Sequence, residues 1–187
     1  MAQKILRIVI AGEGGQGVQA IANILSEAAY NKGKQVLYIP NFGVEQRGGV
    51  SIAFMQISNG PIDTMKFAKA DIVIALSPRS VARTAQYADK RTLFVYDSSN
   101  EIDETSLPAI TKKTMAIPAI DIVKTEFHPI VLNIFVMGAV IGVTKVVDLE
   151  AAKAALEDKL GYKFAKNPSL REMNFAALQR GMQEVGA

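Results

Sequence analysis

A strand, a glycine-rich turn and a helix follow one another near the start of the chain, and this succession constrains the fold more than any other feature. The segment ILRIVIAG, residues 5–12, is apolar except for one arginine and ends in glycine, which is typical of a strand buried on both faces of a parallel sheet. Apolar residues then recur at helical spacing from Val18 to about Lys32, and Gly33 is a suitable end for that helix. The segment KQVLYIP, residues 34–40, follows as a second strand, so we expect a β-α-β unit with a right-handed crossover.

The rest of the chain continues with segments that resemble strands and helices. Three more apolar runs with the length of strands lie at residues 50–58, 70–78 and 91–99. Helical patterns occupy residues 80–88, 130–143, 148–160 and 167–181. The helix at 130–143 is apolar on nearly every side, so we expect it to be buried against the core or against a partner. Together these segments predict an α/β fold: a Rossmann-like, three-layer, mostly parallel sheet of at least five strands, in a single domain over residues 1–187.

The absence of cysteine excludes several kinds of site. Without cysteine the chain forms no disulfide, no thiolate metal site and no iron–sulfur cluster, and it has no cysteine nucleophile. His128 is the single histidine, so neither a zinc site nor a Ser-His-Asp arrangement is expected. We therefore expect neither metal ligands nor catalytic residues in this chain. If it takes part in electron transfer, the metals lie on partner proteins.

Hydropathy and charge favour a cytoplasmic protein that binds neither membranes nor nucleic acids. No run approaches the ~18 consecutive apolar residues of a membrane span, and the start lacks the long apolar region and cleavage site of a signal peptide. The net charge is +3, but Lys and Arg alternate with acidic residues instead of gathering in a basic stripe. Aromatic residues make up 7% of the chain and do not interleave with Lys or Arg, which argues against stacking on bases.

The glycine-rich turn has the chemistry of an anion site. Gly12, Gly14 and Gly17 have the G-x-G-x-x-G spacing, and the strand before them and the helix after them place free N–H groups and a helix dipole at the turn. In such a turn Gly12 permits the tight bend, while Gly14 and Gly15 allow a ligand close to the backbone. Gly17 lets the helix pack near the strand. The alternative is that these glycines only form a tight connection between strand and helix.

Two common kinds of nucleotide site fit this turn poorly. An NAD site needs an acidic residue near the end of the second strand, and LYIPNFG, residues 37–43, has none. An NADP site uses an arginine there, but Arg47 lies within a glycine-rich loop of its own. A Walker loop has G-K-[ST] after its second glycine, whereas Val18 follows Gly17 here. Dinucleotides and nucleoside triphosphates are therefore disfavoured as ligands.

Five segments carry a resemblance to one family. They are GEGGQGV (12–18), PNFGVEQRGGVSIAFMQIS (40–58), ADIVIAL (70–76), NIFVMGAVIG (133–142) and NFAALQRG (174–181). They span nearly the whole chain, which resembles the gamma subunit of 2-oxoacid:ferredoxin oxidoreductases. The loop at 43–49 is similar to the G-P-E-x-R-G-G segment of that family, with Val44 where proline is usual.

The resemblance implies a function within a complex. Enzymes of this family decarboxylate a 2-oxoacid, transfer the acyl group to coenzyme A (CoA) and pass the electrons to ferredoxin. It implies that thiamine diphosphate, Mg²⁺ and iron–sulfur clusters lie on partners, the alpha, beta and iron–sulfur (delta) subunits of a hetero-oligomer, and that this chain alone holds no cofactor. The implied role of the chain is to seat CoA as a substrate and to help the subunits assemble. The family uses pyruvate, 2-oxoglutarate, branched-chain 2-oxoacids and arylglyoxylates, and the chain does not select among them.

The matching motifs imply two sets of CoA-binding residues. The first set is the glycine turn, which binds chiefly through backbone N–H groups with an added amide donor: Gly12, Gly14, Gly15, Gln16 and Gly17. The second set is the loop after the second strand: Asn41, Glu45, Arg47, Gly48 and Gly49. In that loop Arg47 pairs with Glu45 or with a phosphate, or the two side chains lock the loop against another subunit. Capping, turn-forming or backbone-binding roles are expected for four further residues: Asp97, His128, Asn133 and Asn174.

Two other classes of function stay open beside this interpretation. A freestanding Rossmann-type oxidoreductase would bind NAD or NADP by itself. A pure interaction or scaffold subunit would bind no ligand at the glycine turn. Nucleotide binding and the presence of partner subunits separate the three.

Overall fold

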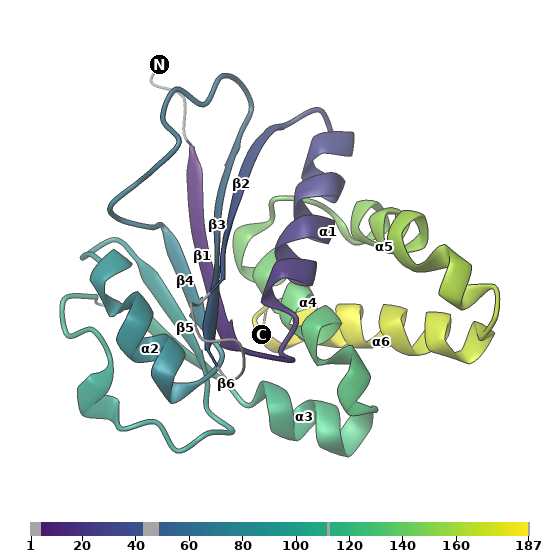
Figure 1. Ribbon diagram of the computed structural model, residues 1–187. Helices are drawn as coiled ribbons and strands as arrows, with labels where there is room; N and C mark the ends of the chain where they lie inside the picture. Colours follow the sequence, from purple (N-terminus) through teal and green to yellow (C-terminus); the bar gives the residue numbers. More distant parts are fainter. Residues whose placement is uncertain (1–4, 43–48, 112, 187) are drawn as a thin grey trace.

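A six-stranded sheet is the middle layer of the computed structural model, which describes residues 5–42, 49–111 and 113–186 (Figure 1). The strands are β1 (Leu6–Glu13), β2 (Gln35–Asn41), β3 (Val50–Ser58), β4 (Ile72–Ala75), β5 (Leu93–Asp97) and β6 (Lys113–Ile117), in the spatial order β2-β3-β1-β4-β5-β6. Strand β3 is antiparallel to both of its neighbours, and the other pairs are parallel. The expected α/β fold with a mostly parallel sheet is confirmed.

Helices cover the two faces of this sheet unequally. One side carries α1 (Val18–Asn31), α3 (Ala119–Glu126), α4 (Leu132–Thr144), α5 (Leu149–Phe164) and α6 (Pro168–Glu184) (Figure 1). The opposite side carries α2 (Pro78–Thr84), which continues into the 3₁₀ segment η1 (Ala85–Tyr87). Two further 3₁₀ turns are η2 (Glu104–Ser106) and η3 (Pro129–Val131). Within the described ranges, no helix is long and apolar enough to cross a membrane.

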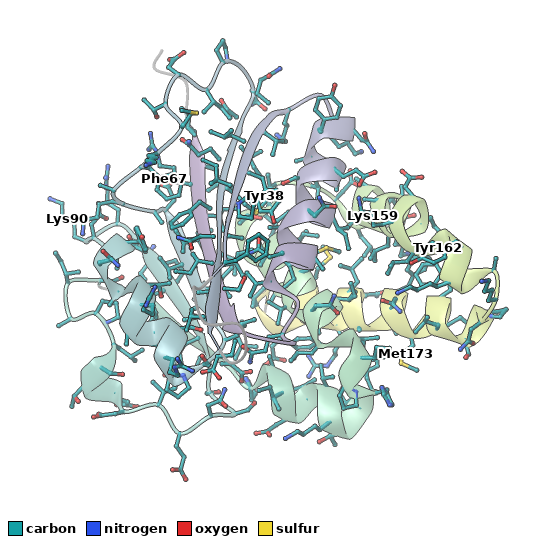
Figure 2. The ribbon with its side chains drawn as sticks, viewed as in Figure 1. Tyr38, Phe67, Lys90, Lys159, Tyr162 and Met173 are labelled. Atoms are coloured by element: carbon teal, nitrogen blue, oxygen red, sulfur yellow. The ribbon has the colours of Figure 1, made fainter. Side chains whose placement is uncertain are left out.

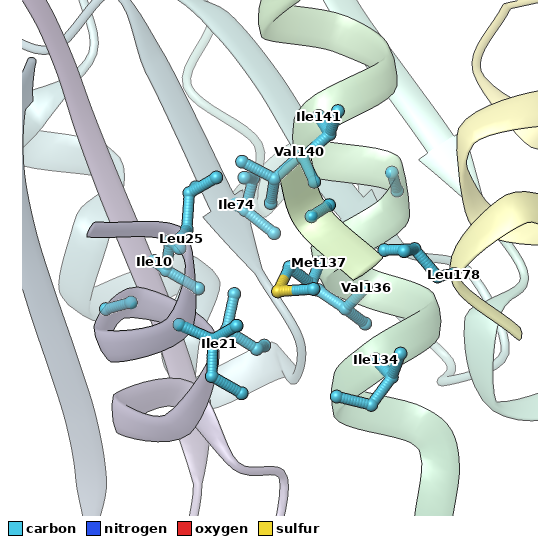
Figure 3. Packing of buried hydrophobic residues seen from close by; sticks show 14 of the residues in the cluster. Ile10, Ile21, Leu25, Ile74, Ile134, Val136, Met137, Val140, Ile141 and Leu178 are labelled. Atoms are coloured by element: carbon cyan, nitrogen blue, oxygen red, sulfur yellow. The ribbon is translucent and has the colours of Figure 1, made fainter. Parts of the chain in front are cut away.

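The apolar strand β1 is buried on both faces because each helical layer covers one of them. Ile8 and Ile10 belong to the core under α1 and α4, whereas Val9 and Ala11 belong to the core under α2. All four side chains are fully buried. Figure 3 shows the first of these cores, where side chains from the sheet, α1, α4 and α6 pack together. The continuous apolar run in the sequence is explained by this double burial.

Helix α4 is buried within the chain itself. Its residues from Ile134 to Gly142 are all buried, and α6 is the helix that packs most closely against it. A Cβ added to Gly138 would lie 2.1 Å from the carbonyl oxygen of Leu178, and one added to Gly181 would lie 2.0 Å from that of Phe135. Glycine therefore lets the two helix backbones touch. Of the two coverings expected for this helix, core or partner, the structure shows the core.

Several elements differ from the expected order. Strand β3 lies between β1 and β2, so the two strands of the predicted β-α-β unit are not neighbours. Strand β6 and helix α3 are additional elements; β6 is mostly exposed and therefore lacks a long apolar run. The helix expected at 80–88 begins at Pro78 and ends as an α-helix at Thr84. The apolar helix begins at Leu132, after η3.

Candidate functional site

The glycine turn lies where two helices leave the sheet in opposite directions. Strands β1 and β4 are parallel neighbours. The helix that follows β1, α1, packs on one face, and the helix that follows β4, α2, packs on the other (Figure 1). In open α/β sheets ligands bind beyond the carboxyl ends of the strands at such a point. This edge is therefore the candidate site.

The backbone of the turn exposes N–H groups. Gly15 and Gly17 have φ of +95° and +73°, in the left-handed region that favours glycine. Gly17 is also the N-cap of α1, and no side chain caps the first turn of that helix. The N–H groups of this turn thus lie at the positive end of the helix dipole. Gly14 and Gly15 are exposed, so an anion has access to the backbone.

The side chain of Gln16 makes two hydrogen bonds to the backbone. Its Oε1 accepts a hydrogen bond from the backbone N–H of Glu13 at 2.7 Å, and its Nε2 donates to the carbonyl oxygen of Leu76 at 2.9 Å. Leu76 directly follows β4, so the side chain of Gln16 joins the ends of β1 and β4. Asn100, beyond β5, donates from Nδ2 to the same carbonyl oxygen at 3.3 Å. Sequence analysis missed Leu76 and Asn100, although both lie at carboxyl ends of predicted strands.

A second glutamine ties the first turn of α1 to the other side of the site. Gln19 Nε2 donates to Ser51 Oγ at 2.7 Å and to the carbonyl oxygen of Ile52 at 3.1 Å. The hydroxyl of Tyr38 donates to Gln19 Oε1, and Figure 2 shows Tyr38 between the sheet and α1. Burial raises the pKa of Tyr38, so its hydroxyl stays a donor at neutral pH. Helical spacing alone does not distinguish Gln19 from an ordinary surface glutamine.

The second predicted loop begins and ends at the same edge of the sheet. Asn41 is the exposed last residue of β2, and Gly49 directly precedes β3. Asn41 pairs with Ile52, which pairs in turn with Ala11 beside the glycine turn. The structure thus brings the ends of both predicted segments to one edge. Three predicted residues of this loop lie outside the described residues: Glu45, Arg47 and Gly48.

The start of α4 also borders the turn. A Cβ added to Gly17 would lie 2.7 Å from Cβ of Asn133, so the close approach at this glycine is to α4. His128 caps η3, because its Nδ1 accepts a hydrogen bond from the backbone N–H of Ile130 at 3.2 Å. Asn174 donates to the carbonyl oxygen of Leu170 at 2.7 Å. The capping role expected for His128 and the backbone-binding role expected for Asn174 are confirmed.

Asp97 is buried at the carboxyl end of β5. Its Oδ1 accepts hydrogen bonds from the backbone N–H of Ser99 at 3.0 Å and from that of Ala119, the first residue of α3, at 3.2 Å. Its side chain is 2% exposed, and its Oδ2 has no hydrogen-bond partner among the described residues. Burial is the largest influence on this carboxyl group and raises its pKa. Asp97 therefore forms the turn, as expected, at a cost in desolvation.

Asp97 is expected to make the stability of the chain fall as pH rises. Because the folded-state pKa lies above the unfolded value of about 4, the stabilising effect of the protonated form is complete below that pH. It is lost as pH rises through the folded-state pKa. Denaturant titrations between acid and neutral pH should show this decrease in the wild type and a smaller one in Asp97→Asn, which cannot ionise. Equal slopes in the two proteins would contradict it.

Fold and site together define a class: a Rossmann-like α/β module with a glycine turn and an uncapped helix N-terminus at the carboxyl edge of its sheet. Comparison with known proteins then defines the family. Residues 7–184 match the pyruvate ferredoxin/flavodoxin oxidoreductase family. The pyruvate/ketoisovalerate oxidoreductases common subunit gamma of Pyrococcus furiosus is 33% identical over 166 residues, which cover 83% of this chain and 89% of that one. The chain therefore belongs to this family, as a gamma subunit of the 2-oxoacid:ferredoxin oxidoreductases.

Solved structures agree with this assignment. The gamma subunit of a keto/oxoacid ferredoxin oxidoreductase from Geobacter sulfurreducens superposes with a TM-score of 0.81 at 29% identity and covers 97% of both chains. The 2-oxoglutarate:ferredoxin oxidoreductase from Magnetococcus marinus, solved with 2-oxoglutarate, CoA and succinyl-CoA bound, gives a TM-score of 0.86. That match covers 97% of this chain and 31% of the other at 22% identity, so it shows the fold alone. The chain is thus a member of an oxidoreductase complex.

Proposed function

We propose that this chain seats CoA at its glycine turn within a thiamine-diphosphate-dependent 2-oxoacid:ferredoxin oxidoreductase. The observation that carries the proposal is the exposed backbone of Gly14 and Gly15, which directly precedes the uncapped start of α1 at the carboxyl edge of the sheet. Backbone N–H groups at such a helix start bind phosphates, and CoA carries a pyrophosphate. The Magnetococcus marinus enzyme, which contains this fold, was solved with CoA bound, so CoA is the anion to test first.

Neither an iron–sulfur cluster nor a metal ion has a set of ligands among the residues that the structure describes. The sequence has no cysteine for an iron–sulfur cluster. In the part of the chain that the structure describes, no three His, Asp or Glu side chains gather to hold a metal ion. We assign thiamine diphosphate, Mg²⁺ and the clusters to alpha, beta and delta partner subunits. When bound there, thiamine diphosphate supplies the electron sink for decarboxylation, and this chain orients CoA, the acceptor of the acyl group.

Subunit assembly is the second contribution that we assign to the chain. A hollow of about 480 Å³ opens beside the edge strand β2. Its lining is mostly apolar and includes Phe54, Phe67 and Tyr87. Figure 2 labels Phe67. At its rim, Phe42 and Met65 are 69% and 73% exposed. Exposed apolar side chains gathered in this way are typical of protein–protein contacts. This face of β2 is our candidate for contact with a partner subunit.

The NAD(P)-binding alternative has less support. In a dinucleotide site, a charged residue at the end of the second strand binds the ribose hydroxyls or the 2′-phosphate. Strand β2 ends at the uncharged Asn41. A relative that is a common subunit of two oxoacid oxidoreductases also favours a shared role such as binding CoA over selection of the 2-oxoacid. We therefore place the choice of 2-oxoacid on the partner subunits.

Native purification of the chain from its source cell is the test of the proposed assembly. We expect a brown eluate with iron–sulfur absorbance, in which mass spectrometry finds subunits that bind thiamine diphosphate. The complex should consume its 2-oxoacid only in the presence of CoA and an electron acceptor. A colourless, solitary protein that binds NAD or NADP would overturn the proposal in favour of a freestanding oxidoreductase.

A further inference from the structure

Gln16 occupies a central place in the candidate site, and its side-chain amide is bonded within the chain at both ends. Its Oε1 is bonded to the N–H of Glu13 at 2.7 Å and its Nε2 to the carbonyl oxygen of Leu76 at 2.9 Å. These two bonds fix the plane of the amide. We propose that Gln16 is a positioning residue, whose two side-chain hydrogen bonds hold the glycine turn in its anion-binding shape.

The bond to Glu13 closes the turn on itself. In the opposite direction, the backbone N–H of Gln16 donates to the carbonyl oxygen of Glu13 at 3.1 Å. The two residues are therefore joined twice, once through the backbone and once through the side chain. Both bonds join Glu13 to Gln16, and Gly14 and Gly15 lie between these two residues. The bonds therefore restrict the shape of this four-residue loop. A loop held in one conformation loses less entropy when it binds a ligand.

The bond to Leu76 attaches this closed loop to the sheet. The position of Leu76 is itself fixed, because its own N–H donates to the carbonyl oxygen of Ala11 in β1 at 2.9 Å. Asn100 donates to the same Leu76 carbonyl oxygen at 3.3 Å and brings in the loop after β5. The ends of three strands, β1, β4 and β5, thus meet through one carbonyl group. Of the residues that donate to this carbonyl oxygen, Gln16 is the one in the glycine turn.

The proposed role also explains why residue 12 is glycine. A Cβ at this position would lie 2.8 Å from Gln16 Oε1 and 2.8 Å from Val18 Cγ2. The oxygen is held by its hydrogen bond to Glu13, so an added methyl group would displace it from that bond. Gly12 is buried and does not have a positive φ. Its small size therefore serves the placement of the Gln16 side chain.

Gln16→Met tests the proposal because methionine has a similar length and makes neither hydrogen bond. This inference rests on the proposed CoA site, so two separate readouts are taken on the assembled complex. Without CoA, exchange of the hydrogen-bonded backbone amides of Glu13 and Gln16 should become about tenfold faster. The KM for CoA should rise about tenfold, and the KM for the 2-oxoacid should stay unchanged. Gly12→Ala should give the same two changes.

Gln86→Met is the matched control. Gln86 Nε2 also donates to a backbone carbonyl oxygen, that of Arg83 at 3.1 Å, but Gln86 is exposed and lies in η1, beyond the C-terminal end of α2. Neither exchange of the Glu13 and Gln16 amides nor the KM for CoA should change in this variant. If Gln16→Met does not assemble, Gln16→Asn takes its place, since it stays uncharged but is one methylene too short to bond both Glu13 and Leu76.

Each combination of results has a distinct meaning. Faster exchange together with a raised KM for CoA supports the positioning role at a CoA site. A raised KM with unchanged exchange would overturn it, because Gln16 would then contact CoA directly. Unchanged exchange with an unchanged KM would also overturn it. Faster exchange with an unchanged KM for CoA would keep the positioning role and overturn the proposed CoA site.

Discussion

Alanine in place of Gly138 is expected to lower the free energy of unfolding by about 3 kcal/mol. The added Cβ would lie 2.1 Å from the carbonyl oxygen of Leu178 and 3.0 Å from its carbonyl carbon. Both atoms belong to the backbone of α6, so no side-chain rotation relieves the overlap and the two helices must move apart. Such a loss is a large part of the stability of an ordinary domain. Denaturant titration followed by circular dichroism measures it.

Gly161→Ala is the control for this prediction. Gly161 lies within α5, and a Cβ added there would meet only the flexible end of Glu157 at 3.7 Å. Because alanine favours the helix more than glycine does, this variant should gain up to about 1 kcal/mol. Gly181→Ala should behave like Gly138→Ala, since its Cβ would lie 2.0 Å from the carbonyl oxygen of Phe135. Equal stability of the Gly138 and Gly161 variants would refute the close contact of α4 with α6.

Valine in place of Gly14 is expected to raise the KM for CoA by about tenfold to a hundredfold. Gly14 is exposed at the turn, and a branched side chain there would cover the backbone N–H groups that an anion needs. Its φ lies outside the left-handed region, so the backbone conformation does not by itself require glycine there. The complex should therefore still assemble. Steady-state kinetics with CoA as the varied substrate, on complex checked by size-exclusion chromatography, measures the effect.

Two internal comparisons make this experiment specific. The KM for the 2-oxoacid should not change, because we place that substrate on the partner subunits. Gly161→Ala complex should keep the wild-type KM for CoA, because α5 does not border the turn. An assembled Gly14→Val complex with wild-type CoA kinetics would show that CoA does not bind at the glycine turn.

Much of the local structure is readable in the sequence. The apolar run at residues 5–12, the helical spacing after Val18 and the end of that helix near Gly33 are all found in the structure. These features depend on interactions between residues that are close in sequence, together with a pattern of burial that repeats along each element. The glycine turn and its place between strand and helix were predictable for the same reason.

The partners of individual side chains were not predictable in this way. The resemblance implied an amide donor at Gln16 but did not indicate that this amide is bonded to Glu13 and to Leu76, which is 60 residues away. Gln19 looks like any residue on the polar side of a helix until Ser51 and Tyr38 are placed beside it. Such contacts depend on which loops share an edge of the sheet, and no local pattern carries that information.

By itself, the sequence determined most of the elements, the position of the glycine turn and, through its motifs, the family. Hydrophobic periodicity and the conformational freedom of glycine are properties of short segments, so they are visible before the chain is folded. Only the tertiary structure decided that β3 lies between β1 and β2, that α6 covers α4, and that Leu76 holds Gln16. These outcomes depend on close packing and hydrogen bonding between segments far apart in the chain, where a difference of a single methyl group or one carbonyl oxygen decides which arrangement fits.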